Sequence, residues 1–73
     1  IYQLPTRTKV KLTIYDAIGR LVTTLVDRIE DSGQKTVVWN GNTNDGSVIA
    51  NGVYFYRLET KEASLVRKLV CNR

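Results

Sequence analysis

The sequence has no histidine, no methionine and only one cysteine among its 73 residues. Without histidine, neither a Ser-His-Asp triad nor a Cys-His nucleophile pair can form, and a His-ligated metal site is excluded. A lone cysteine also excludes an internal disulfide. These absences argue against a self-contained enzyme, so we expect no catalytic residues, no bound metal and no cofactor.

Long apolar runs and a large excess of one charge are missing as well. No stretch approaches the roughly 20 apolar residues that span a bilayer, and we expect no membrane insertion. Eleven Lys and Arg residues against seven Asp and Glu residues give a net charge of +4, and these cations are scattered along the chain. Because nucleic-acid binding calls for a basic stripe with exposed aromatic residues, we expect no nucleic-acid partner.

The remaining composition is that of a small globular protein. Hydrophobic residues make up 42% of the chain and charged residues 25%, an ordinary balance for a folded domain. A chain of this length forms one domain, so we expect residues 1–73 to be a single domain that is monomeric in isolation. The chain begins at Ile1, part-way through an expected strand. We therefore expect a fragment of a longer protein whose first strand is truncated.

Residue types that favour strands are abundant, with nine Val, five Ile and eight Thr residues. Their branched side chains are stiff and suit a pleated sheet. Apolar and polar residues alternate most clearly over residues 9–15, which is typical of a half-buried antiparallel strand. Residues 21–29 also fit a helical spacing, but the adjacent Thr23 and Thr24 favour a strand there.

Three further strands are expected, at residues 35–40, 53–60 and 63–70. The strands at residues 9–15, 35–40 and 53–60 each have one apolar face, and these faces would form the core between two sheets. The predicted core residues are Val10, Leu12, Ile14, Val37, Trp39, Tyr54, Tyr56 and Leu58. Tyr54 follows an Asn-Gly turn and fits a tyrosine corner, in which the hydroxyl group bonds to nearby backbone.

Every glycine falls between the expected strands, in turns that need a positive φ. The predicted turn glycines are Gly19, Gly33, Gly41, Gly46 and Gly52. Residues 40–46 also carry the alternating Asn residues of a calcium-binding loop. However, Gly46 comes one residue later than the EF-hand pattern requires, so we expect a plain hairpin turn without a metal ion.

Five blocks of the sequence resemble, in order, those of a large bacterial family. The opening Ile-Tyr-Gln-Leu-Pro is similar to the end of NPxTxIxYxLP, and residues 14–26 resemble IYDxxGRxVxTLV. Residues 33–41 resemble G…VxWDG, with Asn40 in place of the usual Asp, and residues 45–58 resemble xGxxVxSGVYFYRL. Residues 67–70 resemble the closing RKMVL, whereas the last three residues differ from the usual ending.

This family is the Ig-like C-terminal domain of the flagellar hook-capping protein, and closely similar domains serve as sorting domains in type IX (Por) secretion. The resemblance implies an all-β, immunoglobulin-like antiparallel β-sandwich of about seven strands. It also implies a non-catalytic function, in which the domain directs a larger parent protein through the periplasm to the cell surface or medium. The residues that the outer-membrane secretion machinery would recognise are Arg67, Lys68, Leu69 and Val70.

Alternatives to sorting remain open at this point. The domain could instead be a structural accessory domain whose partner is a neighbouring catalytic domain of the same parent protein. It could also be a weak carbohydrate-binding module, which would need Phe55 or Trp39 exposed in a row of aromatic residues. Phe55, on the face opposite the predicted core, is the better candidate for an exposed contact. Arg67 and Lys68 also fit an ordinary edge strand, where charges discourage aggregation, and Cys71 is expected to be exposed and without a catalytic role.

Overall fold

The computed structural model describes residues 2–39, 41–43 and 46–72, and these residues form strands and turns. The strands are β1 (Tyr2–Leu4), β2 (Thr8–Asp16), β3 (Leu21–Glu30), β4 (Gly33–Lys35), β5 (Gly52–Thr60) and β6 (Ser64–Cys71). Six strands are thus described where about seven were expected. Within the described ranges, no helix has the length and the apolar character needed to cross a membrane.

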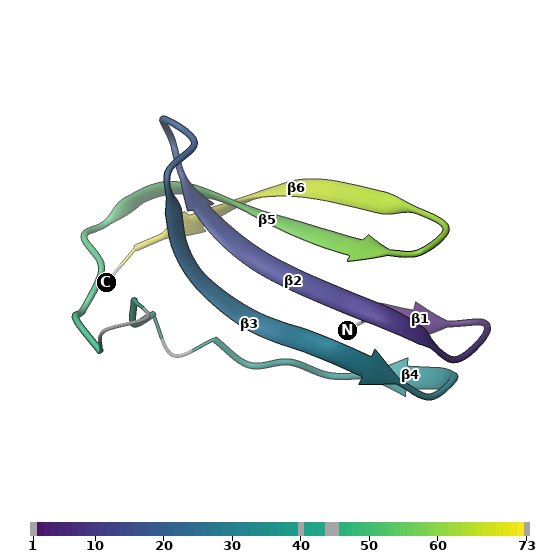
Figure 1. Cartoon of the computed structure of the whole chain (residues 1–73). Helices are drawn as coiled ribbons and strands as arrows, with labels where there is room; N and C mark the ends of the chain where they lie inside the picture. The colour runs from purple at the N-terminus through teal and green to yellow at the C-terminus, as the bar shows by residue number, and fades with distance from the viewer. Residues whose placement is uncertain (1, 40, 44–45, 73) are drawn as a thin grey trace.

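The strands make two antiparallel sheets that face each other (Figure 1). One sheet has the order β3-β2-β5-β6, and the other pairs β1 with β4. The expected all-β fold with two antiparallel sheets is confirmed, and it is consistent with an Ig-like β-sandwich. The two strands of the smaller sheet have three described residues each.

The alternating segment expected at residues 9–15 is β2, and it lies at the centre of the larger sheet. It pairs with β3 on one side and with β5 on the other. Its pairing with β3 shifts register twice, between Leu12 and Thr13 and between Ile14 and Tyr15. Such β-bulges bend and twist a strand, and both β2 and β3 curve strongly in Figure 1.

The strand expected at residues 35–40 is not formed. β4 ends at Lys35, and residues 36–39 belong to no strand. The reason is the lack of a neighbour: Tyr2, the first residue of β1, is paired with Lys35, so no described residue of β1 lies opposite residues 36–39. A segment that favours strand structure needs a partner for its backbone hydrogen bonds. Asn40 lies outside the described residues.

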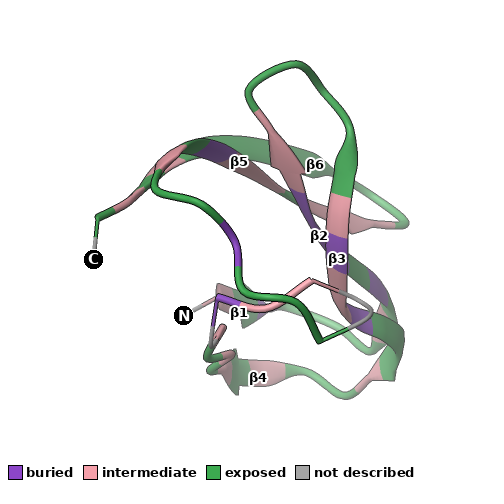
Figure 2. Ribbon diagram, turned by 90° about the vertical axis from the view of Figure 1, so that its left-hand side faces the viewer, coloured by how far each residue is buried: buried purple, intermediate pink, exposed green. Residues whose placement is uncertain are grey.

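The core lies between the two sheets in two clusters. The first contains Leu4, Val10, Leu12 and Val26, and the second contains Ile14, Ile49 and Tyr54. The other predicted core residues, Val37, Trp39, Tyr56 and Leu58, are partly buried and pack against these clusters. Figure 2 shows the buried segments on β2, β3 and β5, whereas β6 is mostly exposed. Residues 21–29, ambiguous in sequence, form β3, because a strand here can bury Val26 against β2.

All five glycines have a positive φ, from 80° at Gly41 to 152° at Gly52. Gly33 and Gly52, however, are the first residues of β4 and β5 rather than turn residues. In the turn between β2 and β3, the Asp16 carboxylate accepts hydrogen bonds from the backbone N–H groups of Ile18 and Arg20. The bond from the Arg20 backbone is the main reason that the pKa of Asp16 is lowered, and the Arg20 side chain adds to the effect.

Candidate interaction surface

Among the described residues, no three Cys, Asp and Glu side chains gather in a group that could hold a metal ion. Several acidic groups instead pair with cations at the surface, as Asp31 does with Arg7 at 3.6 Å and Asp27 with Lys9 at 3.8 Å. The candidate functional regions are therefore the surfaces of the two sheets.

The outer face of the larger sheet, which points away from β1 and β4, is apolar at one end. Tyr15 and Phe55 are paired across β2 and β5, and Val53 and Val70 across β5 and β6. Together with the residues around them they form what we call the outer patch: Tyr15, Ile18, Leu21, Val53, Phe55, Val66 and Val70. Four members expose more than half of their surface, namely Ile18, Leu21, Val66 and Val70. An antiparallel sheet whose outer face meets only water normally carries polar residues there.

The other end of the same face is charged. Lys11 is paired with Asp27 on β3 and with Glu59 on β5, and Lys9 makes its salt bridge with Asp27 nearby. Opposite charges across neighbouring strands are an ordinary way to cover a solvated face. The outer face therefore changes from charged to apolar along the strands. Its apolar end is the candidate binding surface.

Trp39 and Phe55, the two aromatic residues considered for stacking on a sugar, do not lie in one row. Trp39 packs on the inner side, where its ring meets Tyr54 edge-to-face with centroids 6.0 Å apart. Its indole Nε1 donates a hydrogen bond to the Asn42 carbonyl at 3.0 Å. Phe55 is half-buried on the opposite, outer face of the sheet, where Tyr15 is its neighbour.

Tyr54 makes the contact expected of a tyrosine corner. Its hydroxyl group donates a hydrogen bond to the Ala50 carbonyl oxygen at 2.7 Å, while its ring is buried against Ile14 and Ile49. The bond fixes the start of β5 to the loop that precedes it. Tyr54 thus has a structural role.

Strand β6 forms one edge of the larger sheet and carries the four residues that we expected to be recognised. Arg67, Lys68 and Val70 are exposed, whereas Leu69 is half-buried. Neither cation takes part in a salt bridge with any described residue. Cys71 was expected to be exposed, but it is half-buried, because it packs against the core cluster of Ile14, Ile49 and Tyr54.

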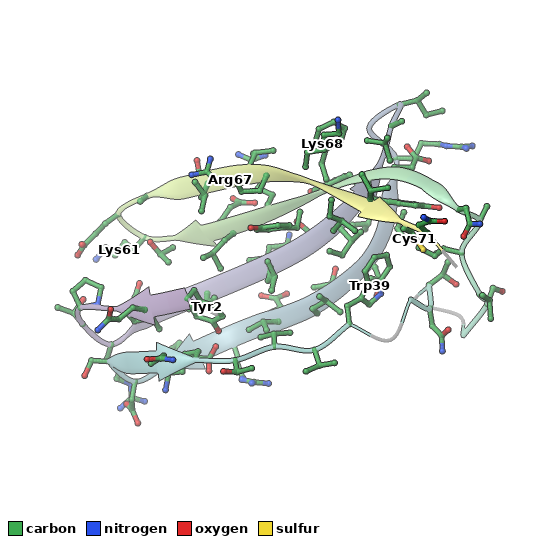
Figure 3. The ribbon with its side chains drawn as sticks, turned by 180° about the vertical axis from the view of Figure 1, so that it is seen from behind. Tyr2, Trp39, Lys61, Arg67, Lys68 and Cys71 are labelled. Carbon is green, nitrogen blue, oxygen red and sulfur yellow. The ribbon has the colours of Figure 1, made fainter. Side chains whose placement is uncertain are left out.

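An apolar cavity of about 270 Å³ lies between the two sheets. Its walls come from both layers: Tyr2, Leu12, Ile14, Leu25, Val37, Trp39, Tyr56, Leu58, Leu65 and Leu69. In Figure 3, β6 and Tyr2 of β1 lie on the near side of the molecule, at the free edges of the two sheets. Sequence reasoning missed this cavity, although the alternate spacing of Leu65 and Leu69 indicated an inward-facing side of β6.

The two sheets are also joined by a hydrogen bond that the sequence did not reveal. The Tyr2 hydroxyl donates to the Glu30 carboxylate, which joins β1 to the end of β3. Burial, and after it the bond to Glu30, together raise the pKa of Tyr2 to about 12. Arg28 in turn lies 3.8 Å from the other oxygen of Glu30.

Comparison with known proteins agrees with this architecture. Residues 2–64 match the family model of the FlgD Ig-like domain. No curated protein and no solved structure gives a significant match. The matched region ends at the first residue of β6, so it lends no support to Arg67 and Lys68 as part of a type IX sorting signal, which stays a prediction. Because the match covers β1 to β5 in full, the chain belongs to the FlgD Ig-like domain family.

Proposed function

We propose that this chain is a non-catalytic structural accessory domain that packs against a neighbouring domain of its parent protein. Membership of an Ig-like domain family supports an accessory role. The observation that carries the proposal is the outer patch, because four of its apolar members expose more than half of their surface, and apolar residues exposed together on one face mark interaction sites.

The chemistry of the outer patch indicates what kind of surface it fits. Its members are aliphatic and aromatic, and Lys68 lies beside Phe55 in the register of β5 and β6. A complementary surface would be apolar with a carboxylate placed to meet Lys68. Burial of apolar area at about 25 cal/mol per Å² would drive the association, and the charge would set the orientation.

The test compares two substitutions on one strand, made in the parent protein. Leu21→Glu puts a charge into the outer patch, whereas Ile29→Glu puts it at the charged end of the same face, opposite Lys9. Both residues are more than half exposed, so both variants should fold. We expect Leu21→Glu to separate the unfolding of the two domains in calorimetry, and Ile29→Glu to leave it unchanged. Equal behaviour of the two variants would count against docking through the patch.

Sorting through a type IX-like system is a second candidate function, with the outer-membrane secretion machinery as partner. The observation that favours it is the exposure of Arg67, Lys68 and Val70 on an edge strand. A reporter fused to this chain, in a bacterium with that apparatus, should reach the surface or medium. The same fusion carrying Arg67→Glu and Lys68→Glu should stay in the periplasm. If both fusions stay there in folded form, the sorting proposal is wrong.

A further inference from the structure

Strand β6 presents a long backbone edge without a partner. It pairs with β5 in one unbroken register, from Gly52 opposite Cys71 to Glu59 opposite Ser64. No described residue pairs with its other edge. An edge of this length offers a row of backbone N–H and C=O groups to any extended chain that can lie beside it.

The apolar cavity lies directly inside this edge. Leu65 and Leu69 line the cavity, and Leu65 is also 39% exposed. A strand added beside β6 would alternate in the same way, so every second side chain would point over the cavity. An apolar cavity of about 150 Å³ already holds a benzene-sized group. The cavity here, at about 270 Å³, therefore has room for aliphatic side chains from an added strand.

The charges on β6 restrict which strand can bind. Arg67 and Lys68 occupy the middle of the strand, and successive residues of a strand point to opposite faces. Positive charge thus stands on both faces of the edge, and no described carboxylate pairs with it. If a second copy of this chain paired antiparallel about the middle of β6, cations would face cations, which destabilises a strand pair. A strand with carboxylates at these positions would be stabilised instead.

From this geometry we propose that β6 is a second binding site, in which an extended segment of a partner protein adds as a fifth strand to the larger sheet. The segment has acidic residues at two adjacent central positions, one facing inward beside Arg67 and one facing outward beside Lys68, and large aliphatic residues at the inward-facing positions on either side of the centre. Its backbone bonds to the free edge of β6, its aliphatic side chains enter the cavity, and its carboxylates meet Arg67 and Lys68. This site goes beyond the proposed accessory function, because it uses the strand edge and the inner cavity rather than the outer patch.

The probe is a labelled peptide with the sequence Leu-Thr-Leu-Thr-Glu-Glu-Leu-Thr-Leu, added to the 73-residue chain at low salt. Its matched control replaces both Glu residues with Lys. We expect fluorescence anisotropy to show binding of the acidic peptide and at least about tenfold weaker binding of the basic one. The Arg67→Glu, Lys68→Glu double variant should reverse this preference, and the backbone amides of β6 should gain protection from hydrogen exchange.

Three outcomes would overturn the proposal. One is that the acidic peptide fails to bind at millimolar concentration or binds no better than the basic one. Another is that charge reversal on β6 leaves the preference unchanged. The third is that the chain forms a dimer through β6 at low salt without peptide. The Leu21→Glu variant keeps this test separate from the proposed accessory function, because we expect it to lose domain docking and to keep peptide binding.

Discussion

The larger sheet has two edges, β3 and β6, and they are built in different ways. The β3 edge shifts register twice against β2, and its Asp27 and Glu30 form salt bridges with Lys9 and Arg28. The β6 edge is regular over its whole length, and half of its side chains are aliphatic. The two outer strands of one sheet therefore present very different surfaces.

The difference shows which edge is available for binding. Bulges and charged side chains are the usual means by which proteins keep edge strands from pairing with other chains. β3 has both, and the Tyr2–Glu30 bond ties its end to β1. β6 has only Arg67 and Lys68. These two residues repel a second copy of the chain but attract an acidic strand, so the edge discriminates between partners.

The largest expected effect is on the free energy of unfolding, and it appears when a Val→Ala substitution on β3 is compared with one on β6. Val26 of β3 is 3% exposed and Val66 of β6 is 54% exposed. Val26→Ala should lower the free energy of unfolding by about 2 kcal/mol, because it leaves a void in the core. Val66→Ala should change it by less than about 0.5 kcal/mol. Urea denaturation measures both, and similar losses would mean that β6 is packed as tightly as β3.

A smaller loss of stability is expected from a substitution near the start of β5, the strand that pairs with β6. Tyr54→Phe removes the hydrogen bond to the Ala50 carbonyl and should lower the free energy of unfolding by about 1 kcal/mol. Tyr15→Phe is the matched control, because Tyr15 lies on the outer face and its hydroxyl group has no hydrogen-bond partner among the described residues. Urea denaturation of both variants measures the difference. An equal loss in both would rule out the tyrosine corner as the cause.

The Tyr2–Glu30 hydrogen bond, which joins the end of β3 to β1, should make the stability of the fold depend on pH in the alkaline range. The folded-state pKa of Tyr2, about 12, is above its ordinary value of 10.0. The bond therefore stabilises the fold fully below pH 10 and loses its contribution as the pH rises from 10 to 12. Tyr2→Phe should be less stable than the parent chain at pH 8, and the gap should narrow by pH 12. If the stability difference between the parent chain and Tyr2→Phe stays constant from pH 8 to pH 12, the Tyr2–Glu30 bond does not have this role.

The smallest effect concerns self-association rather than stability. At 1 M salt the Debye length falls to about 3 Å, so Arg67 and Lys68 no longer keep two β6 edges apart. We expect concentrated protein to associate at 1 M but not at 0.05 M salt, as measured by light scattering. Val66→Lys should suppress this association, whereas Ile29→Lys on β3 should not. Suppression by Ile29→Lys alone would place the reactive edge on β3.

The sequence predicts best the strands that have a neighbour on each side. β2 and β5 show clear alternation because one face of each packs on the core, and both form where they are expected. Residues 36–39 are also rich in residues that favour strands, but no described residue pairs with them, so propensity alone was misleading there. Pairing depends on residues far away in the chain, and local sequence does not report it.

The place of a strand within its sheet is equally hidden from local sequence. β6 carries apolar residues on both faces, as a buried central strand would, yet it lies at the edge and is mostly exposed. It lies at the edge because, among the described strands, it pairs only with β5. The interlayer cavity and the Tyr2–Glu30 bond also depend on how the two sheets are stacked, which no periodicity in the sequence encodes.

The unequal pairing of strands in the two sheets has a mechanical consequence. Among the described residues, three residue pairs hold β1 to β4, whereas eight hold β6 to β5. A load applied across both sheets should therefore separate the described part of β1 from β4 before β6 leaves β5. The Tyr2–Glu30 hydrogen bond, which joins β1 to β3, should raise the force that this first separation needs.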